Sequence, residues 1–581
     1  MPVSNPELVT LLESVATALS IKKEKNAIFQ IRAYENAASA IEHSTSDVHD
    51  LWAEGRLGEI PGIGENLKKY LDEYFKTGKV SHFETLMKGI PEVVFELIKI
   101  PGVGPKTAQE LASLKVKSIS DLKQQIKSGE LVKNGFSAKA VQKIMLGIQE
   151  METLKTGRML LPIASIYASQ ILEYLKKSPD VVDADPLGSL RRQVATVGDL
   201  DFAASSKHPE KVIEYFTKMP EILQVVSEGE HKVMVVLKNG LHVDLLVGEP
   251  ESYGALLQHF TGSKQHNIHL RTYAEDHGLS LSERGVKNIK TGKVVPTKTE
   301  KEFYNLLKMD VPEPEIREDG GEIEAGIAHK LPKLVQIEDI KGDLHLHSAF
   351  PIEKPSHAPG ADSLEDIVEY AKKLGYEYVG ISDHSPSPNM PKEAILATIQ
   401  KRTEAIERLK STKSIRVLNG LEIDILPDGT LSVPNEALKT LDYCIAGVHS
   451  SHKMGKEDMT KRILAALESP YVDIISHPTG RLLNERDSFD ADWEAIFKAA
   501  AKNKKLLEIN AFPNRLDLRD DLIKMALTFG VKFIIDTDAH EKSFMQNMGF
   551  GVAVAKRGWA TKKDVVNTWN WQDFAKWFEI E

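Results

Sequence analysis

The chain lacks the features that mark secreted and membrane proteins. It has 1 cysteine in 581 residues, Cys444, which excludes a disulfide framework and favours a reducing compartment. The N-terminal residues do not combine a basic region with an apolar run, and no apolar run is long enough to span a bilayer. We therefore expect a cytoplasmic protein without a membrane partner.

The chain also lacks the excess of positive charge that is usual in nucleic-acid-binding proteins. Its net charge is −10, from 74 Lys and Arg against 84 Asp and Glu. A nucleic acid would therefore have to meet local basic spots, for which the candidates are Arg191, Arg192, Lys264 and Arg271. The hydrophobic content of 41 % is ordinary for globular proteins, and 581 residues are too many for one core. Three or four domains are expected.

The first 150 residues predict helices interrupted by a repeated glycine motif. Ile60-Pro61-Gly62-Ile63-Gly64 recurs as Ile100-Pro101-Gly102-Val103-Gly104, an offset of 102 − 62 = 40 residues, and each copy precedes an expected helix (Leu67–Phe75 and Lys106–Leu114). Glycines permit a tight hairpin whose amides, at a helix N-terminus, can hold a phosphate. The two copies resemble helix-hairpin-helix motifs, which hold the DNA backbone without recognising its sequence. The candidate DNA contacts are Gly62, Gly64, Gly102 and Gly104.

Three aspartates lie in segments that predict neighbouring strands. Asp199 and Asp201 are two residues apart in the expected strand Val197–Ala203, so their side chains would point to the same face. Asp244 lies in the second arm of a hairpin turned by Asn239-Gly240. Three convergent carboxylates can hold the two divalent metals of a phosphoryl transfer.

A turn upstream of the aspartates is suited to phosphate. Gly188-Ser189 offers backbone amides and a hydroxyl to phosphate oxygens, and Arg191 and Arg192 add positive charge.

The ordered set of motifs resembles the polymerase β-like nucleotidyltransferases, and residues 259–271 resemble family X DNA polymerases in particular. Phe260-Thr261-Gly262-Ser263 matches that family's F-T-G-S. The resemblance implies that Asp199 and Asp201 bind both catalytic metals, Mg²⁺ or Mn²⁺. Asp244 would bind one metal and orient or deprotonate the primer 3′-hydroxyl. The residues implied around the incoming deoxynucleoside triphosphate (dNTP) and the template are Gly188, Ser189, Arg192, Gly198, Phe260, Gly262, Asn267 and Arg271.

Two positions depart from the family pattern. His259 precedes Phe260 where a tyrosine is common, which leaves discrimination against the 2′-hydroxyl open. Tyr70 stands where the family can carry a lysine that forms a Schiff base with a sugar-phosphate remnant. Tyrosine has no amine, so the resemblance does not carry over a lyase activity.

The pattern changes after residues 310–340, which are acidic, rich in proline and glycine, and poor in core residues. Beyond them, apolar runs alternate with helical stretches, which predicts a parallel α/β barrel. The seven runs are Gly342–His347, Tyr378–His384, Ile415–Glu422, Tyr443–His449, Val472–His477, Leu506–Asn510 and Val531–Asp538.

Almost every run ends in a residue that can bind a metal. In such a barrel the C-terminal strand ends meet at one mouth, so these side chains would converge. Imidazole and carboxylate ligands suit Zn²⁺, Mn²⁺ or Fe²⁺ better than Mg²⁺ alone. The candidate ligands are His345, His347, His384, Glu422, His449, His477, Asp538 and His540.

The segments Asp343–Ser348, Ser382–His384, Gly420–Glu422 and Thr537–His540 resemble the polymerase and histidinol phosphatase (PHP) domain. This resemblance implies hydrolysis of phosphoesters with two or three metals. His345, His347, Glu422 and Asp538 would hold the first metal, Glu422 would bridge to a second with His449 and His477, and His384 and His540 would hold a third. The family's loop ends in Ser-Asp-Gly, whose Asp helps to bind the third metal, but here Ala358-Pro359-Gly360 takes its place. His357 and Asp362 are alternative substitutes.

Together the resemblances imply a multidomain chain: an α-helical helix-hairpin-helix region, an α/β nucleotidyltransferase palm with a thumb, and a C-terminal (β/α)7 PHP barrel. The expected domains are residues 1–90 and 91–150 (one hairpin each), 151–250 (palm), 251–315 (thumb), 316–340 (linker) and 341–581 (barrel). The implied protein is a bacterial, monomeric, nucleoid-associated enzyme of base-excision repair that acts on gapped or nicked DNA and dNTPs. It would fill short gaps and, as an exonuclease, 3′-phosphatase or abasic-site nuclease, process 3′ ends.

Two other hypotheses remain open. The polymerase half could serve mainly as a DNA-binding module of a repair nuclease, which primer extension would decide. Alternatively, the chain could be a metabolic phosphatase such as histidinol phosphatase, which a screen of small phosphoesters would test.

Overall fold

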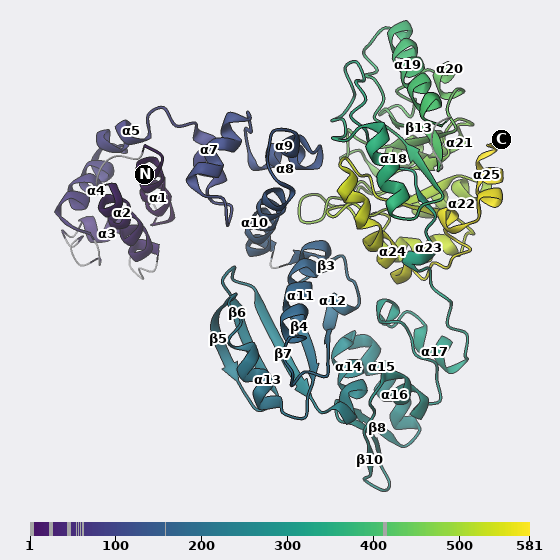
Figure 1. Ribbon diagram of the computed structural model, residues 1–581, viewed down its shortest axis with the longest axis horizontal. Coiled ribbons are helices and arrows are strands. Elements are labelled where there is room, and N and C mark those ends of the chain that lie inside the picture. The colour runs from purple at the N-terminus through teal and green to yellow at the C-terminus, as the bar shows by residue number, and fades with distance from the viewer. Residues whose placement is uncertain are drawn as a thin grey trace. The chain divides into compact units, whose positions relative to one another are not determined.

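The computed structural model describes residues 5–22, 27–42, 48–53, 55, 57, 60, 63–156, 158–410 and 415–580 (Figure 1). The chain forms two compact units: Met1–Ile126 with Asn134–Met151, and Lys127–Lys133 with Glu152–Glu581. No described helix combines the length and the apolar character that a membrane span requires.

Within the described residues up to Thr156 the secondary structure is helical, as expected for the first 150 residues. The helices in chain order are α1 (Asn5–Lys22), α2 (Ala27–Glu42), α3 (Val48–Ala53), α4 (Glu65–Thr77), α5 (Ser81–Met87), α6 (Glu92–Leu97), α7 (Pro105–Ser113), α8 (Ile119–Lys127), α9 (Glu130–Lys133) and α10 (Ala138–Thr156). Leu12 of α1, Leu71 of α4 and Phe83 of α5 are buried in one core. Helices α4 and α7 are the two expected after the glycine motifs, with ends shifted by one or two residues.

The palm region contains a five-stranded sheet in the order β2-β4-β7-β6-β5. Its strands are β2 (Asp183–Pro186), β4 (Leu200–Ser205), β5 (Ile222–Glu228), β6 (Lys232–Leu237) and β7 (His242–Gly248). β4 and β7 are parallel, and the other pairs are antiparallel. The remaining elements of this region are β1 (Met159–Leu160), α11 (Leu161–Leu175), α12 (Gly188–Arg191), β3 (Thr196–Val197) and α13 (Pro209–Phe216).

One expectation about the palm was wrong in detail. Val197–Ala203 is not one strand, because β3 ends at Val197 and β4 begins at Leu200. Gly198 and Asp199 form a bend between them. The reason is that β3 pairs with β1 in a separate two-stranded sheet, so the chain has to turn before it enters the main sheet.

The thumb region combines helices with a small three-stranded sheet. Its elements are η2 (Pro250–Ser252), α14 (Tyr253–Thr261), α15 (Lys264–Asp276), β8 (Leu279–Ser282), β9 (Gly285–Asn288), β10 (Val294–Val295) and α16 (Glu300–Leu306). The segment after it, expected to be a linker, is structured and contains η3 (Pro314–Ile316), α17 (Glu322–Ile327) and η4 (Ile337–Asp339).

Buried charged residues fix that segment to the thumb. Arg317 Nη1 lies 2.5 Å from Glu300 Oε1, and Glu322 Oε1 lies 2.6 Å from His266 Nδ1. Arg317 and Glu322 are fully buried. A composition poor in apolar residues indicated a linker, but these buried charge pairs, together with Ile323 in the apolar core of the thumb, fix the segment in place.

The C-terminal region is the predicted parallel barrel, with seven strands in sequence order. The strands are β11 (Gly342–Asp343), β12 (Tyr378–Ile381), β13 (Arg416–Asp424), β14 (Tyr443–Gly447), β15 (Ile474–Ile475), β16 (Leu506–Asn510) and β17 (Lys532–Asp536). Beyond β11 and β17, Leu346 and Ala539 form a parallel bridge that brings the first and last strands together. Each of the seven predicted runs overlaps a strand, and the candidate metal ligands lie just beyond the strand ends, except Glu422, which lies within β13.

Helices between the strands and after the last one complete the barrel. They are α18 (Leu364–Lys373), α19 (Lys392–Lys410), α20 (Asn435–Leu438), α21 (Lys456–Glu468), α22 (Trp493–Lys502), α23 (Asp520–Leu527), η5 (Lys542–Asn547), α24 (Met548–Arg557), η6 (Val566–Thr568) and α25 (Trp571–Phe578). The end of the barrel opposite the ligands is filled by buried apolar residues, among them Leu344, Tyr378, Ile445 and Phe574. This packed core leaves only the C-terminal strand ends to carry chemistry.

Candidate active sites

The three aspartates of the palm converge. Asp201 and Asp244 are direct neighbours across the parallel strands β4 and β7. Burial, followed by the nearby charges of Asp199 and Asp244, raises the pKa of Asp201 to about 6. The charges of Asp199 and Asp244 add to the effect of burial, and a pair of divalent cations would neutralise these carboxylates.

A lysine that sequence reasoning missed lies against this cluster. Lys232 Nζ is 2.5 Å from Asp244 Oδ2, and its side chain is 48 % exposed whereas that of Asp244 is 17 % exposed. Lys232 begins β6, the hairpin partner of β7. The sequence placed Lys232 just before a strand expected to pair with the strand of Asp244, which was the available signal. A lysine at the start of a strand, however, is ordinarily exposed to solvent.

The Gly188-Ser189 turn lies beside the aspartates. Gly188 has a φ of +55°, and a Cβ added there would be 3.0 Å from Asp201 Oδ2. The backbone amide of Leu187 also donates to the carbonyl of Asp201 (2.8 Å). The turn that was predicted to meet phosphate therefore borders the carboxylates.

The two adjacent arginines have different surroundings. Arg191 forms an ion pair with Glu300 (Nη2 to Oε2, 2.7 Å). Arg192 Nη1 donates to the carbonyl of Thr261 (2.6 Å), and its Nε donates to Glu318 Oε1 (2.9 Å). A Cβ on Gly262 would be 3.1 Å from Arg192 Nη1, so Arg192 and Gly262 are close neighbours. Arg191 supports the thumb, and Arg192 joins the turn to the Phe260–Ser263 segment.

Phe260, Asn267 and Arg271 all contact His259. The Asn267 Nδ2 donates to the carbonyl of His259 (2.7 Å), and its Oδ1 accepts from Gln258 Nε2 (2.9 Å). Arg271 Nη2 is 3.5 Å from His259 Nδ1, and the His259 and Phe260 rings are 4.7 Å apart. Ser263 caps α15, whose first turns carry Asn267 and Arg271.

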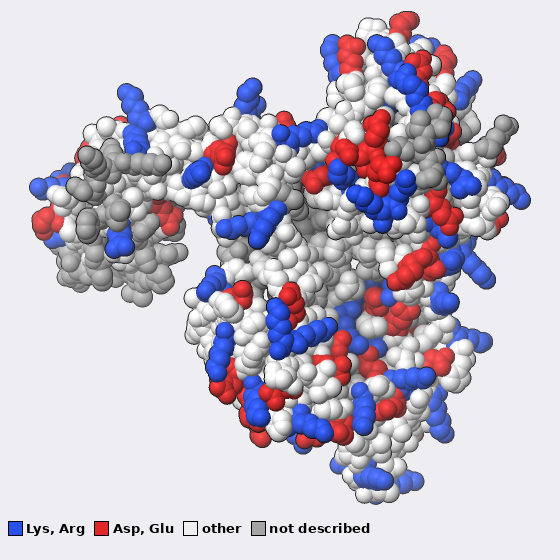
Figure 2. Space-filling model, in the orientation of Figure 1, with Lys and Arg blue, Asp and Glu red and all other residues white. Residues whose placement is uncertain are grey.

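The glycine motifs have matching backbones where both are described. Gly64 (φ −82°, ψ 174°) and Gly104 (φ −83°, ψ 172°) each cap the N-terminus of a helix without a side-chain bond. Gly102 has a φ of +80°, which favours glycine, and lies near the Lys143 side chain. Gly62 lies outside the described residues. On the face shown in Figure 2, positive and negative side chains are interspersed.

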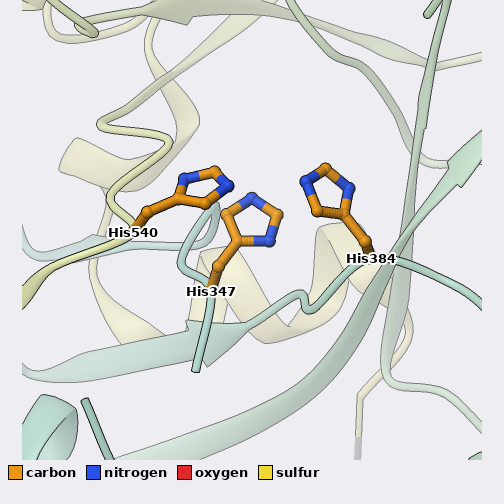
Figure 3. Close-up of side chains that lie close together, drawn as sticks. All are labelled: His347, His384 and His540. Carbon is orange, nitrogen blue, oxygen red and sulfur yellow. The ribbon is translucent and has the colours of Figure 1, made fainter. Parts of the chain in front are cut away.

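The barrel mouth brings all of its candidate ligands together. Glu422 is central: its Oε2 is 3.2 Å from His345 Nε2 and 2.9 Å from His384 Nδ1, and its Oε1 is 3.1 Å from His477 Nε2. His449 Nε2 is 3.2 Å from Glu422 Oε1, and His347 Nε2 is 3.4 Å from Asp538 Oδ1. Figure 3 shows His347, His384 and His540 with their rings gathered; the His347 ring is 4.2 Å from that of His384 and 4.0 Å from that of His540.

The cluster fits divalent metals. His345 Nε2, His347 Nε2 and Glu422 Oε2 are buried atoms without a hydrogen-bond partner among the described residues. Buried polar atoms almost always have a partner, so atoms of this kind that face one another indicate a shared cation. In several sets of three His, Asp or Glu residues, the possible ligand atoms lie within 4.8 Å of one another. They include His345-His347-Asp538, His347-His384-His540 and Glu422-His449-His477.

Protonation in the cluster follows from burial and charge. Burial opposes ionisation of Glu422, but His345 and other imidazoles hold its pKa well below the usual range. Burial, and then His347, lowers the pKa of His384 to about 3. Burial would also lower the pKa of His449, but Glu422 and Asp424 raise it to about 9. An ionised carboxylate and neutral imidazoles are the forms that bind metals, and at His449 a metal would compete with a proton.

Two carboxylates that orient these ligands were missed by sequence reasoning. Glu508 Oε1 is 2.6 Å from His345 Nδ1, and its Oε2 accepts from the His477 amide (2.6 Å). Asp424 Oδ1 is 2.7 Å from His449 Nδ1. Such bonds fix the ring so that the other nitrogen faces the metal. The available signals were a glutamate inside the apolar run Leu506–Asn510, and an aspartate two residues after Glu422 on the same strand face.

Four parts of the chain match models of known families. A helix-hairpin-helix domain matches residues 3–80, and a SAM-like helix-hairpin-helix tandem matches residues 94–150. The DNA polymerase beta thumb matches residues 256–318, and the PHP domain matches residues 343–512.

The chain is also similar to curated proteins. It is 34 % identical over 577 residues to the DNA polymerase/3′-5′ exonuclease PolX of Bacillus subtilis (strain 168). The aligned residues make up 98 % of each chain. It is 28 % identical over 236 residues to a probable phosphatase of Thermoanaerobacter sp. (strain X514). These residues make up 39 % of this chain and 89 % of that protein. A probable phosphatase of Clostridium acetobutylicum is 31 % identical over 208 residues, 34 % of this chain and 78 % of its own length.

Proposed function

The chain belongs to the bacterial family X DNA polymerases that carry a C-terminal PHP domain, and we propose that it fills short gaps in DNA at the aspartate site and trims 3′ ends at the barrel site. The observation that carries the proposal is the presence, in one chain, of a three-aspartate cluster beside the Gly188-Ser189 turn and of a buried histidine-carboxylate cluster. The similarity to PolX over 98 % of both chains supports the pairing of these two activities.

In the polymerase reaction, the primer 3′-oxygen would attack the α-phosphorus of a dNTP, and pyrophosphate would leave. Asp199, Asp201 and Asp244 would hold two Mg²⁺ or Mn²⁺ ions, which would stabilise charge on the attacking and leaving oxygens. Asp244 would orient or deprotonate the 3′-hydroxyl. Arg192 and the Gly188-Ser189 turn would bind the triphosphate, which requires a phosphate oxygen to replace Glu318 on Arg192 Nε.

Other residues would select the nucleotide. The Gly198 backbone would support the triphosphate, and Phe260 and Gly262 would border its sugar. Asn267 would reach the minor-groove edge of the incoming base, and Arg271 would reach the template strand. Because Asn267 is bonded to His259 and Gln258 in this structure, its role at the base requires that these bonds open when a nucleotide binds. Gly62, Gly64, Gly102 and Gly104 would hold the DNA backbone through amides.

In the barrel, water would attack the terminal phosphodiester, and the bond from phosphorus to the 3′-oxygen of the remaining strand would break. His345, His347, His384, Glu422, His449, His477, Asp538 and His540 would hold two or three Mn²⁺, Zn²⁺ or Fe²⁺ ions, which would activate the water and neutralise the phosphate. Glu508 and Asp424 would keep His345 and His449 in position. Gapped or nicked DNA in base-excision repair, bound by a monomer at the bacterial nucleoid, is the proposed setting.

The test uses a labelled duplex with a one-nucleotide gap, Mn²⁺, and reactions with and without dNTPs. Asp199→Ala is expected to abolish extension and spare trimming, and His345→Ala is expected to abolish trimming and spare extension. Glu210→Ala and His329→Ala are matched controls on exposed side chains (67 % and 64 % exposed) and are expected to change neither activity. If the wild-type chain trims but never extends, the polymerase half is a DNA-binding module and the proposal fails.

A phosphatase activity at the barrel site is a second candidate, because two probable phosphatases are similar to part of this chain. A duplex that ends in a 3′-phosphate would test it. Release of inorganic phosphate that His345→Ala removes would establish 3′-phosphatase activity. Release of nucleotides alone would limit the site to exonuclease chemistry.

A further inference from the structure

The barrel contacts the polymerase half at the arginine that is proposed to bind the triphosphate. Arg557 ends the barrel helix α24 and lies beside Glu318, in the segment that follows the thumb. Its Nη1 donates to Glu318 Oε1 (3.0 Å) and to the backbone carbonyl of Arg192 (2.9 Å). Glu318 Oε1 also accepts from Arg192 Nε (2.9 Å). One carboxylate oxygen is therefore shared between the nucleotide-binding arginine and an arginine of the barrel.

Glu318 occupies the place that an anionic ligand would take on Arg192. The Arg192 Nη1 is already used by the carbonyl of Thr261 (2.6 Å), and its Nε is used by Glu318. A guanidinium binds carboxylate and phosphate oxygens through the same N–H groups. A triphosphate oxygen and Glu318 therefore compete for Arg192 Nε, and the negative charge of Glu318 repels a triphosphate beside it.

The barrel offers Glu318 a second cationic partner that does not depend on Arg192. Asp520 holds Arg557 in place, because its Oδ2 lies 2.8 Å from Arg557 Nε and 2.7 Å from Arg557 Nη2. The Nη1 of Arg557 remains directed at Glu318. The Glu318 side chain is 35 % exposed, whereas that of Arg557 is 9 % exposed. Glu318 can therefore change its rotamer and release Arg192 while it keeps Arg557.

Other contacts of α24 fix the backbone that carries Glu318. Lys556 Nζ lies 2.7 Å from Glu313 Oε2 and 2.6 Å from Glu315 Oε1. Two neighbouring cations of the barrel thus pair with three carboxylates of one short segment. Because the segment is anchored in this way, the exchange of partners at Glu318 requires movement of its side chain alone.

We propose that Glu318 competes with the incoming dNTP for Arg192 and that Arg557 of the barrel holds Glu318 when the triphosphate displaces it. The inference deepens the proposed gap-filling function and rests on it. Without nucleotide, Glu318 stands in for a phosphate oxygen on Arg192. Glu318 therefore lowers the affinity for dNTP, and Arg557 limits that loss. Both are positioning residues, through which the barrel sets the dNTP requirement of the polymerase site without touching the reacting atoms.

The test measures the affinity of the complementary dNTP for the full-length chain on a one-nucleotide gap whose primer lacks a 3′-hydroxyl. The nucleotide binds there without reacting, and His345→Ala is present in every sample so that the primer is not trimmed. Glu318→Gln is expected to bind dNTP more tightly than its parent, by up to about fivefold, the range of a partly exposed ion pair. Arg557→Gln is expected to bind dNTP more weakly. The double variant is expected to match Glu318→Gln, because Arg557 acts through Glu318.

Glu313→Gln is the matched control, because it removes a contact between the same segment and Lys556, and it is expected to leave the dNTP affinity unchanged. In gap filling with an ordinary primer, the KM for dNTP is expected to shift in the same directions as the affinity, with a smaller change in kcat. Equal weakening by Arg557→Gln with and without Glu318 would overturn the inference, since Arg557 would then act only through the Arg192 carbonyl.

Two further outcomes separate the inference from the function on which it rests. An unchanged dNTP affinity in Glu318→Gln, with a parent that binds dNTP and extends primers, would overturn the inference alone. A parent that binds no dNTP on the gapped duplex would overturn the proposed gap filling and the inference together.

Discussion

The two candidate sites differ in how they would hold metals. In the barrel, strand ends from across the fold supply buried imidazoles and carboxylates, and Glu508 and Asp424 fix their orientation. In the palm, Asp201 and Asp244 lie on two neighbouring strands, Asp199 is exposed in a bend, and Lys232 contacts Asp244. The barrel site is built by the fold before substrate arrives. The palm site lacks most of the ligands of a hard cation, so phosphate oxygens and water have to complete it.

Metal removal should separate the sites most clearly. After treatment with a chelator and its removal, we expect Mg²⁺ alone to restore extension at once, whereas trimming stays lost until Mn²⁺ or Zn²⁺ is added. Loading one site at about 1,000 times its Kd stabilises the folded state by about 4 kcal/mol, so the chelated chain should unfold at a lower temperature. Calorimetric unfolding measures this shift.

The comparison provides its own controls. The double variant Asp199→Ala and Asp201→Ala should show the full stability shift on chelation, and His345→Ala should show a smaller one. If chelation lowers the unfolding temperature equally when the barrel ligand His345 is absent, the pre-built barrel site is refuted.

The polymerase half should depend on ion pairs for stability. Burial would raise the pKa of Glu300, but Arg317 and Arg191 lower it from 4.5 to about 2. The folded-state pKa is depressed, so the stabilisation is present above about pH 4.5 and is lost as pH falls through about 2. A shift of this size corresponds to about 3 kcal/mol.

Urea unfolding of the wild type and Glu300→Gln at pH 7, 5 and 3 tests this. The variant should be less stable at pH 7, because two arginines lose their partner, and its stability should change less with pH. Glu302→Gln, on the exposed side of α16, is the matched control. Equal pH dependence of Glu300→Gln and wild type would show that the ion pairs do not carry the acid sensitivity.

The same contrast explains what the sequence could predict. All seven barrel strands were predictable, because buried parallel strands are short apolar runs and their metal ligands follow at the ends. The packing of residues 310–340 was not predictable, because Arg317 and Glu322 look like solvated charges until Glu300 and His266 are placed beside them. Partners of that kind are far apart in the chain, and composition carries no information about them.

The palm shows where periodicity fails. Asp199 and Asp201 have the spacing of a strand face, but β3 pairs with another sheet, so Asp199 lies in a bend. Glu508 was missed for a related reason. It is a charged residue in an apolar run, and its role in orienting ligands depends on contacts with His345 and His477, which are distant in sequence.

Removing the carboxylate that orients His345 should weaken the barrel site without emptying it. In Glu508→Gln the His345 ring loses a charged hydrogen-bond partner. Loss of a contact of this kind typically lowers metal affinity by about 10- to 100-fold. The Mn²⁺ concentration that half-saturates trimming should rise by that factor, while the Mg²⁺ dependence of extension stays unchanged. Glu468→Gln, an exposed glutamate of α21, is the control. An unchanged Mn²⁺ requirement would mean that Glu508 does not position His345.

The smallest expected effect lies at the palm site, where a lysine competes with the metal. Lys232→Met removes the cation 2.5 Å from Asp244, so the half-saturating Mg²⁺ concentration for extension should fall. Exposed ion pairs contribute about 0.2–1 kcal/mol, which limits the change to about fivefold or less. Lys211→Met, on a 55 % exposed lysine of the same region, is the control. A rise in the Mg²⁺ requirement would show instead that Lys232 holds Asp244 in its binding position, and the palm site would then be partly pre-built, like the barrel.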